Sequence, residues 1–128
     1  MSGRLFTVEE ANALLPALIR LMERVFAARE ELVAAGEELE RVFAKSSGNG
    51  GSKGASRAAA EMSVITEIVA EIRGLGCELK DLDQGLVDFP ARHPEGKGRV
   101  VYLCWRYGEE KIEWWHETDA GFAGRQRL

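Results

Sequence analysis

Cysteine is scarce in this chain of 128 residues, and no run of apolar residues is long. The two cysteines, Cys77 and Cys104, lack the C-x-x-C spacing that is typical of redox and zinc motifs. No apolar stretch approaches the roughly 18 residues that a membrane span needs, and the first residues lack the apolar core of a signal peptide. We therefore expect a cytoplasmic protein that does not enter a membrane and keeps both cysteines as free thiols.

Positive charge is not in excess either. The chain carries 17 Lys and Arg residues against 21 Asp and Glu residues, a formal net charge of −4. This balance gives no electrostatic reason to expect nucleic acid as a partner. The fractions of hydrophobic residues, 45%, and charged residues, 30%, are ordinary for a globular protein. The length suits one hydrophobic core, so we predict a single domain over residues 1–128.

Helical periodicity dominates the first half of the sequence. Thr7-Val8-Glu9-Glu10 matches a capping box, and apolar residues then recur every three or four positions in a seam like that of a coiled coil. Pro16 either kinks this helix or separates a short helix from a longer one. The Gly- and Ser-rich residues 46–56 are predicted to be a flexible linker, followed by a second helix over 57–73.

The two predicted helices differ in length. Residues 7–75 are expected to form an antiparallel helical hairpin in which the first helix has more apolar surface than the second can cover. An apolar stripe without cover favours association with another copy of the chain. We therefore expect a homo-oligomer, most simply a homodimer.

The second half, residues 77–128, is predicted to be a β-meander of three to four strands with a C-terminal tail. Residues 86–89 are typical of one strand, and residues 99–107 and 112–117 of a hairpin whose turn is centred on Glu109 and Glu110. The predicted fold class is α+β, a long antiparallel helical hairpin packed on a small antiparallel β-meander.

The predicted turn fixes the register of the hairpin. It places Trp105 opposite Trp114 and Leu103 opposite His116, and the period of two then separates an apolar face from a polar-aromatic face. Three interpretations of the polar-aromatic face stay open: a self-association surface, a surface covered by residues 121–128, and a ligand-binding or catalytic cleft. The residues of this candidate functional surface are Asp88, Tyr102, Arg106, Glu113, Trp115 and Glu117.

Secondary candidates lie beside this surface. Asp81-x-Asp83 resembles the start of a calcium loop, but the fifth, sixth and twelfth positions do not match, so a turn capped by the aspartates is favoured. Asp is also disfavoured within a strand unless a partner satisfies it, and we predict Arg106 or Arg125 as the partner of Asp88.

The alternation of the predicted hairpin argues against a metal site. It points His116 away from Cys104 and Glu117, so we expect no metal and no cofactor. His116 is then a histidine at the edge of the core, hydrogen-bonded to backbone or carboxylate, and Cys104 is small apolar filler. His93, which precedes Pro94, is expected to be exposed.

Motifs spread over nearly the whole chain point to one family. They are Phe6-Thr7-Val8-Glu9-Glu10-Ala11-Asn12, Leu15-Pro16, Leu79-Lys80-Asp81, Gly85-Leu86-Val87-Asp88-Phe89-Pro90, Val101-Tyr102-Leu103-Cys104-Trp105-Arg106, Trp115-His116-Glu117 and Gly121-Phe122-Ala123-Gly124-Arg125-Gln126. With them the sequence resembles the prokaryotic domain-of-unknown-function family 2203. The resemblance supports one domain and implies no activity, cofactor or catalytic residue.

The function expected from the sequence is that of a small interaction or assembly module that acts as a homo-oligomer and is not an enzyme. The alternative is a weak metal-dependent or small-ligand-binding enzyme that uses the polar face of the sheet. An enzyme should have a concave pocket on that face, whereas an assembly module should bury Trp115 or the uncovered part of the first helix.

Overall fold

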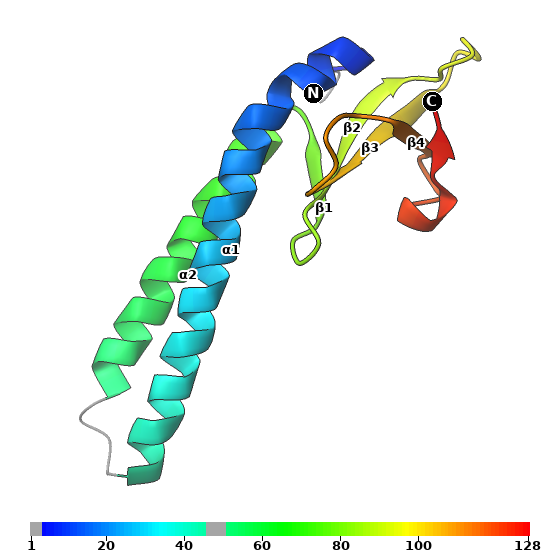
Figure 1. Cartoon of the computed structure of the whole chain (residues 1–128). Helices are drawn as coiled ribbons and strands as arrows, with labels where there is room; N and C mark the ends of the chain where they lie inside the picture. The colour runs from blue at the N-terminus through cyan, green and yellow to red at the C-terminus, as the bar shows by residue number, and fades with distance from the viewer. Residues whose placement is uncertain (1–3, 46–50) are drawn as a thin grey trace. The chain divides into compact units, whose positions relative to one another are not determined.

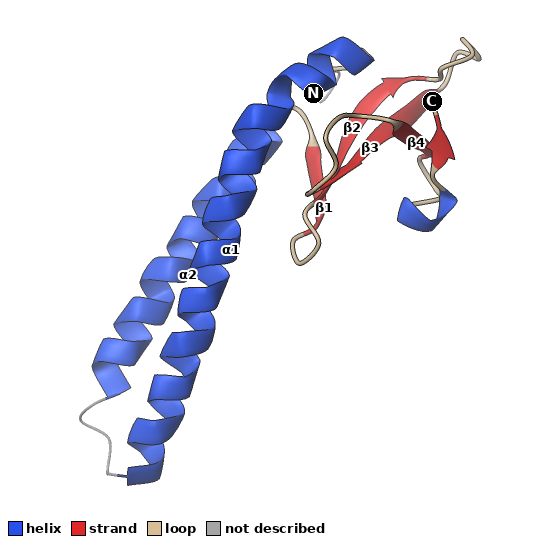
Figure 2. Cartoon of the chain, in the orientation of Figure 1, coloured by secondary structure: helices blue, strands red, loops and turns tan. Residues whose placement is uncertain are grey.

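The computed structural model describes residues 4–45 and 51–128 and places two helices and a five-stranded sheet in them (Figures 1 and 2). The α+β class is confirmed, but the prediction of three to four strands was wrong. The additional strand is a two-residue segment at the end of the chain, too short to give a periodic pattern. The elements are α1 (Val8–Lys45), α2 (Gly51–Gly74), β1 (Glu78–Asp81), β2 (Leu86–Arg92), β3 (Val100–Arg106), β4 (Trp114–Glu117), the 3-10 helix η1 (Phe122–Gly124) and β5 (Gln126–Arg127).

The chain divides into two compact units. The first, called the sheet unit, comprises Met1–Met22 and Glu71–Leu128, and the second, called the helical unit, comprises Glu23–Ala70. In the part of the chain that the structure describes, no helix is both long and apolar enough to cross a membrane.

The helical unit is an antiparallel pair made by the later part of α1 and most of α2 (Figure 2). Arg57 on α2 bridges to Glu31 and Glu38 on α1. Gly54 lets the two helices approach closely, because a Cβ atom there would lie 2.8 Å from the Cγ atom of Leu39. Helix α2 begins at Gly51, so residues 51–56 are helical and the prediction of a flexible linker was wrong for them. The rest of that predicted linker, residues 46–50, lies outside the described residues.

The first helix begins as the sequence predicts. The Glu10 amide donates to the Thr7 Oγ1 atom at 3.0 Å, and the Thr7 amide donates to the Glu10 Oε1 atom at 2.9 Å, so the capping box is confirmed. Helix α1 continues through Pro16 as one element. The alternative of a separate short helix before Pro16 is therefore wrong.

The sheet unit contains an antiparallel sheet with the order β1-β2-β3-β4-β5. One face of the three central strands is buried, and we call it the core face. Val87 and Phe89 on β2 lie there, each with no exposed surface. Phe6 packs edge-on against Phe89 with ring centroids 5.3 Å apart, and its amide donates to the Pro90 carbonyl at 2.7 Å. Other buried residues of the core face are Ala91, Val101, Leu103, Trp105 and Trp115.

Candidate functional site

The register between β3 and β4 differs by one residue from the predicted one. Tyr102 lies opposite His116 and Cys104 lies opposite Trp114. The connection between these strands, residues 107–113, is longer than a tight turn, and the Trp105 indole donates to the Glu109 carbonyl inside it at 2.9 Å. A shift of one residue moves every side chain of a strand to the other face. His116 and Cys104 therefore share a face, and Trp115, predicted on the polar-aromatic face, is 7% exposed on the core face.

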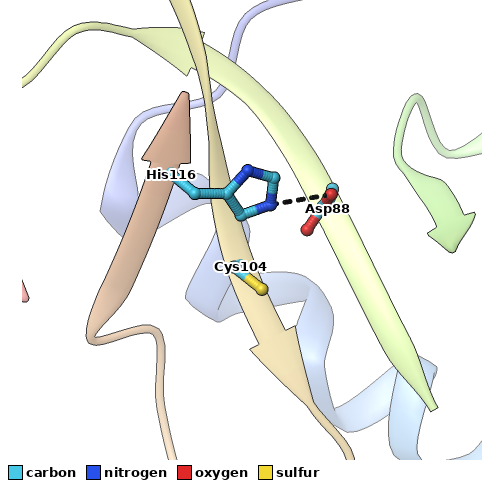
Figure 3. A group of neighbouring side chains, drawn as sticks. All are labelled: Asp88, Cys104 and His116. Atoms are coloured by element: carbon cyan, nitrogen blue, oxygen red, sulfur yellow. Dashed lines mark hydrogen bonds and ion pairs between the residues drawn. The ribbon is translucent and has the colours of Figure 1, made fainter. Parts of the chain in front are cut away.

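Three polar side chains converge on the face opposite the core face. Asp88 on β2, Cys104 on β3 and His116 on β4 extend from three neighbouring strands (Figure 3). One ligand atom from each lies within 4.8 Å of the other two, and the residues are only 3%, 1% and 2% exposed. We call these residues the Asp-Cys-His cluster. Burial of a carboxylate, a thiol and an imidazole together demands partners for all of them.

The hydrogen bonds of His116 show which of its two ring nitrogens carries a proton. The Nδ1 atom lies 2.8 Å from the carbonyl oxygen of Glu117, which can only accept, so Nδ1 carries a proton. The Nε2 atom lies 3.0 Å from the Oδ2 atom of Asp88. In the neutral tautomer with Nδ1 protonated, Nε2 and a carboxylate are both acceptors and repel each other. A second proton or a bound cation must therefore join Nε2 to Asp88.

Cys104 is held as a thiol by its surroundings. Burial, followed by the negative charge of Asp88, raises the pKa of Cys104 to about 12, while the guanidinium of Arg125 acts in the opposite direction. A thiol with so high a pKa is not an activated nucleophile at neutral pH. A divalent cation would change this, because a coordinating thiol gives up its proton to the solvent when it binds metal.

Arg125 connects the C-terminal tail to the cluster. Its guanidinium donates to both carboxylate oxygens of Glu109 at 2.7 Å and to the Cys104 carbonyl at 3.1 Å, and it lies 4.5 Å from the centre of the Phe122 ring. Although burial raises the pKa of Glu109, hydrogen bonds from Arg125 and from the Arg106 amide hold it below its usual value. The Arg125 Nε atom is buried without a hydrogen-bond partner in the described structure. These contacts fix the tail beside Cys104.

A cavity of about 110 Å³ opens next to the cluster. Lys80 from β1 and Gly121 and Phe122 from the tail contribute to its walls. Lys80 lies on the same face of the sheet, with its Nζ atom 3.2 Å from a Glu78 carboxylate oxygen and 4.4 Å from the centre of the Tyr102 ring. All three cluster residues also line the cavity, together with Leu86 and Thr118.

The structure brings only part of the predicted surface together. Tyr102 lies near the cluster, with its ring centroid 5.6 Å from that of His116 and its hydroxyl donating to Glu78 at 2.9 Å. Glu117 instead pairs with Arg99, whose Nε atom lies 3.0 Å away, and Glu113 pairs with Arg127 at 3.2 Å. The predicted register would also have placed Arg106 opposite Glu113, whereas in the structure Arg106 lies opposite Leu86 on β2.

The predicted partners of Asp88 were also wrong. Its carboxylate contacts His116, while Arg125 binds Glu109 and Arg106 is exposed at the end of β3. The expectation that His116 is hydrogen-bonded to backbone or carboxylate is confirmed, since it makes both contacts. His93 was expected to be exposed, but it is 5% exposed and stacks edge-on with Trp115.

Two further expectations concern the secondary candidates. Asp81 accepts a hydrogen bond from the Gln84 amide at 3.1 Å, so its predicted role as a turn cap is confirmed. Asp83 lies exposed in the same turn. Sequence reasoning missed Cys104 as a member of the site, and Lys80 and Phe122 as walls of the cavity. The correct register of β4 would have placed Cys104 beside His116.

The reason for expecting no metal no longer holds, because it depended on His116 and Cys104 lying on opposite faces of the sheet.

Comparison with known proteins identifies a family for this chain. The model of the family described as "Uncharacterized conserved protein (DUF2203)" matches residues 4–128. Neither the curated proteins nor the solved structures contain a match to this chain.

Proposed function

The chain belongs to the DUF2203 family of uncharacterised conserved proteins, and we propose that it binds one divalent transition-metal ion through Asp88, Cys104 and His116. The observation that carries this proposal is the convergence of a carboxylate, a thiol and an imidazole within 4.8 Å in a buried position beside a cavity. Sulfur, nitrogen and oxygen ligands together suit borderline-soft ions of the zinc class rather than calcium or magnesium.

The surroundings of His116 fit this role. A histidine that binds a metal usually donates its second ring N–H to a carbonyl or carboxylate, which orients the ring. The Nδ1–H of His116 donates to the Glu117 carbonyl in this way, and the Nε2 atom is left to face Asp88. A cation between Nε2 and Asp88 replaces the repulsion of two acceptors with two bonds.

The distances in the cluster are close to those that a metal requires. Bonds of roughly 2.0–2.3 Å to nitrogen, oxygen and sulfur place tetrahedral ligand atoms about 3.3–3.8 Å apart. The His116–Asp88 separation of 3.0 Å must therefore widen slightly on binding, and the cluster as a whole stays within 4.8 Å. Three protein ligands with a fourth position open to a cavity are typical of reactive metal sites, whereas structural zinc sites have four protein ligands.

Cobalt(II) titration tests the proposal. The chelator-treated protein is expected to bind about one Co²⁺ per chain and to develop the thiolate-to-metal charge-transfer absorption of a cysteine ligand. His116→Ala should abolish this absorption. His93→Ala is the matched control, because His93 is also a buried histidine but lies outside the cluster, with its Nδ1 atom accepting from the Glu95 amide at 3.1 Å. Absence of stoichiometric binding, or binding that survives His116→Ala, contradicts the proposal.

Self-association remains a second proposal, now supported by the helical unit. Val33 is 63% exposed and borders a groove that is also lined by Phe26, Arg29 and Glu30 on α1. An exposed apolar side chain beside a groove on a long helix suits a second copy of the chain. The expectation of a homodimer therefore stays a proposal for this surface.

Light scattering with Val33→Glu tests this second proposal. The parent protein is expected to show about twice the mass of the 14.1 kDa chain at micromolar concentration. Val33→Glu should shift the mass toward the monomer, because a charge buried in an apolar interface weakens it by tenfold or more, about 1.4 kcal/mol. A monomeric parent would remove the proposal without affecting the metal site.

A further inference from the structure

We propose that the cavity beside the Asp-Cys-His cluster binds a small oxyanion, with one oxygen on the metal and another facing Lys80. This inference rests on the proposed metal site, because the cavity meets the metal's open coordination position. It goes beyond that site by naming the chemical class of its ligand.

The size of the cavity limits the ligand. A volume of about 110 Å³ corresponds to three or four water molecules at roughly 30 Å³ each. A ligand with about three to five non-hydrogen atoms fills this space, which admits formate, bicarbonate or acetate. Phe122 and Leu86 add apolar walls to the cavity, which favours a ligand of this size over a larger one.

The charge of the cavity sets the sign of the ligand. A divalent ion bound to the Asp88 carboxylate and the Cys104 thiolate forms a neutral centre, because the two negative charges balance the metal. Lys80 is the cation among the residues that line the cavity. Burial lowers the pKa of Lys80, but the hydrogen bond and the charge of Glu78 outweigh this and raise it, so Lys80 is an ammonium at neutral pH. Glu78 balances this charge but does not line the cavity, so the charged group that faces a ligand beside the neutral metal centre is the Lys80 ammonium, which favours an anion.

The position of Lys80 is suited to a ligand that spans the cavity. Glu78 accepts from Lys80 through Oε1 and from the Tyr102 hydroxyl through Oε2, so the same carboxylate holds both side chains. A lysine ammonium has three donors, and those not directed at Glu78 remain for a ligand oxygen. A charge-assisted hydrogen bond of this kind is stronger than one between neutral groups.

Titration of the cobalt-loaded protein with sodium formate, bicarbonate, acetate and benzoate tests the inference. The three small anions are expected to change the visible spectrum of the bound cobalt, whereas benzoate is too large to do so. In Lys80→Met the dissociation constants of the small anions should rise by about tenfold or more, through loss of a charge-assisted hydrogen bond, while one cobalt per chain is still bound. Lys97→Met is the matched control, because Lys97 also pairs with a glutamate at 3.2 Å but does not line the cavity. Its anion affinities should stay unchanged.

The other possible results distinguish failure of the anion inference from failure of the metal site. If cobalt binds at one per chain but no small anion changes its spectrum, the anion inference is wrong and the metal site stands. Equal effects of Lys80→Met and Lys97→Met would also overturn it, as would benzoate binding as tightly as acetate. If cobalt does not bind, the proposed function fails and this inference fails with it.

Discussion

Asp88→Ala is expected to lower the free energy of unfolding of the metal-free protein by about 3 kcal/mol, because breaking a buried charged pair leaves its partner uncompensated. The partner is His116, whose Nε2 atom lies 3.0 Å from Asp88, and both side chains are almost fully buried. The variant leaves an imidazole without a hydrogen-bond partner on one ring nitrogen and a space in place of the carboxylate. Urea denaturation of parent and variant in the presence of a chelator measures the difference.

Asp88→Asn is the informative control. The Asn side-chain NH₂ can donate to Nε2 of a neutral His116 that keeps its proton on Nδ1, so the hydrogen bond survives without a buried charge. We therefore expect Asp88→Asn to lose less than about 1 kcal/mol of stability and to lose its metal affinity, because it no longer supplies a carboxylate. If Asp88→Ala is as stable as the parent, the contact with His116 does not contribute to the fold.

The hydrophobic half of the fold could be predicted from the sequence. Strand β2 was found because Val87 and Phe89 alternate with Asp88, and both apolar residues are fully buried in the structure. The start of α1 was found because the Thr7 and Glu10 side chains bond within one helical turn. Such signals depend on residues close together in the chain, where spacing alone decides which side chains can meet.

The site could not be predicted, because it depends on the pairing of β3 with β4. Trp114 and Trp115 follow each other, and either can serve as the apolar residue of an alternating strand. The choice between them decides whether His116 faces Cys104. The structure places Trp115 in the core, where its ring meets that of His93 edge-on, and leaves Trp114 with the guanidinium groups of Arg125 and Arg127 5.1 and 5.2 Å from its ring centre. Contacts with residues distant in the sequence made that choice.

The partner of Arg125 in the C-terminal tail also depends on contacts between residues distant in the sequence. The sequence suggests that Arg125 reaches an acid, but several acids precede it in the chain and spacing does not choose among them. Glu109 is selected because the connection between β3 and β4 carries it to a point where its carboxylate also accepts from the Arg106 amide at 2.8 Å. This arrangement fixes the tail next to the cavity, which links the path of the chain to the shape of the candidate site.

Zinc at about a thousand times its dissociation constant is expected to raise the free energy of unfolding by about 4 kcal/mol, since a ligand that binds only the folded state stabilises it by mass action. Cys104→Ala removes one of three ligands. Changes to residues that only orient a ligand already lower metal affinity by about 10–100-fold, so we expect a loss of at least about a hundredfold. At the same zinc concentration the stabilisation should then fall to about 1.4 kcal/mol or less.

Cys77→Ala is the control that separates the loss of zinc stabilisation from the general effect of removing a buried thiol. Cys77 is 1% exposed, as is Cys104, and burial raises its pKa to about 11, but it lies outside the Asp-Cys-His cluster and its sulfur donates to the Ile72 carbonyl at 3.4 Å. Both variants should lose some stability without metal, because each leaves a small space in the core. Only Cys104→Ala should lose the stabilisation by zinc. Urea denaturation of the parent and the two variants, with zinc and with chelator, gives the comparison. An equal response of all three proteins to zinc would show that the ion binds elsewhere, and the role assigned to Cys104 would be wrong.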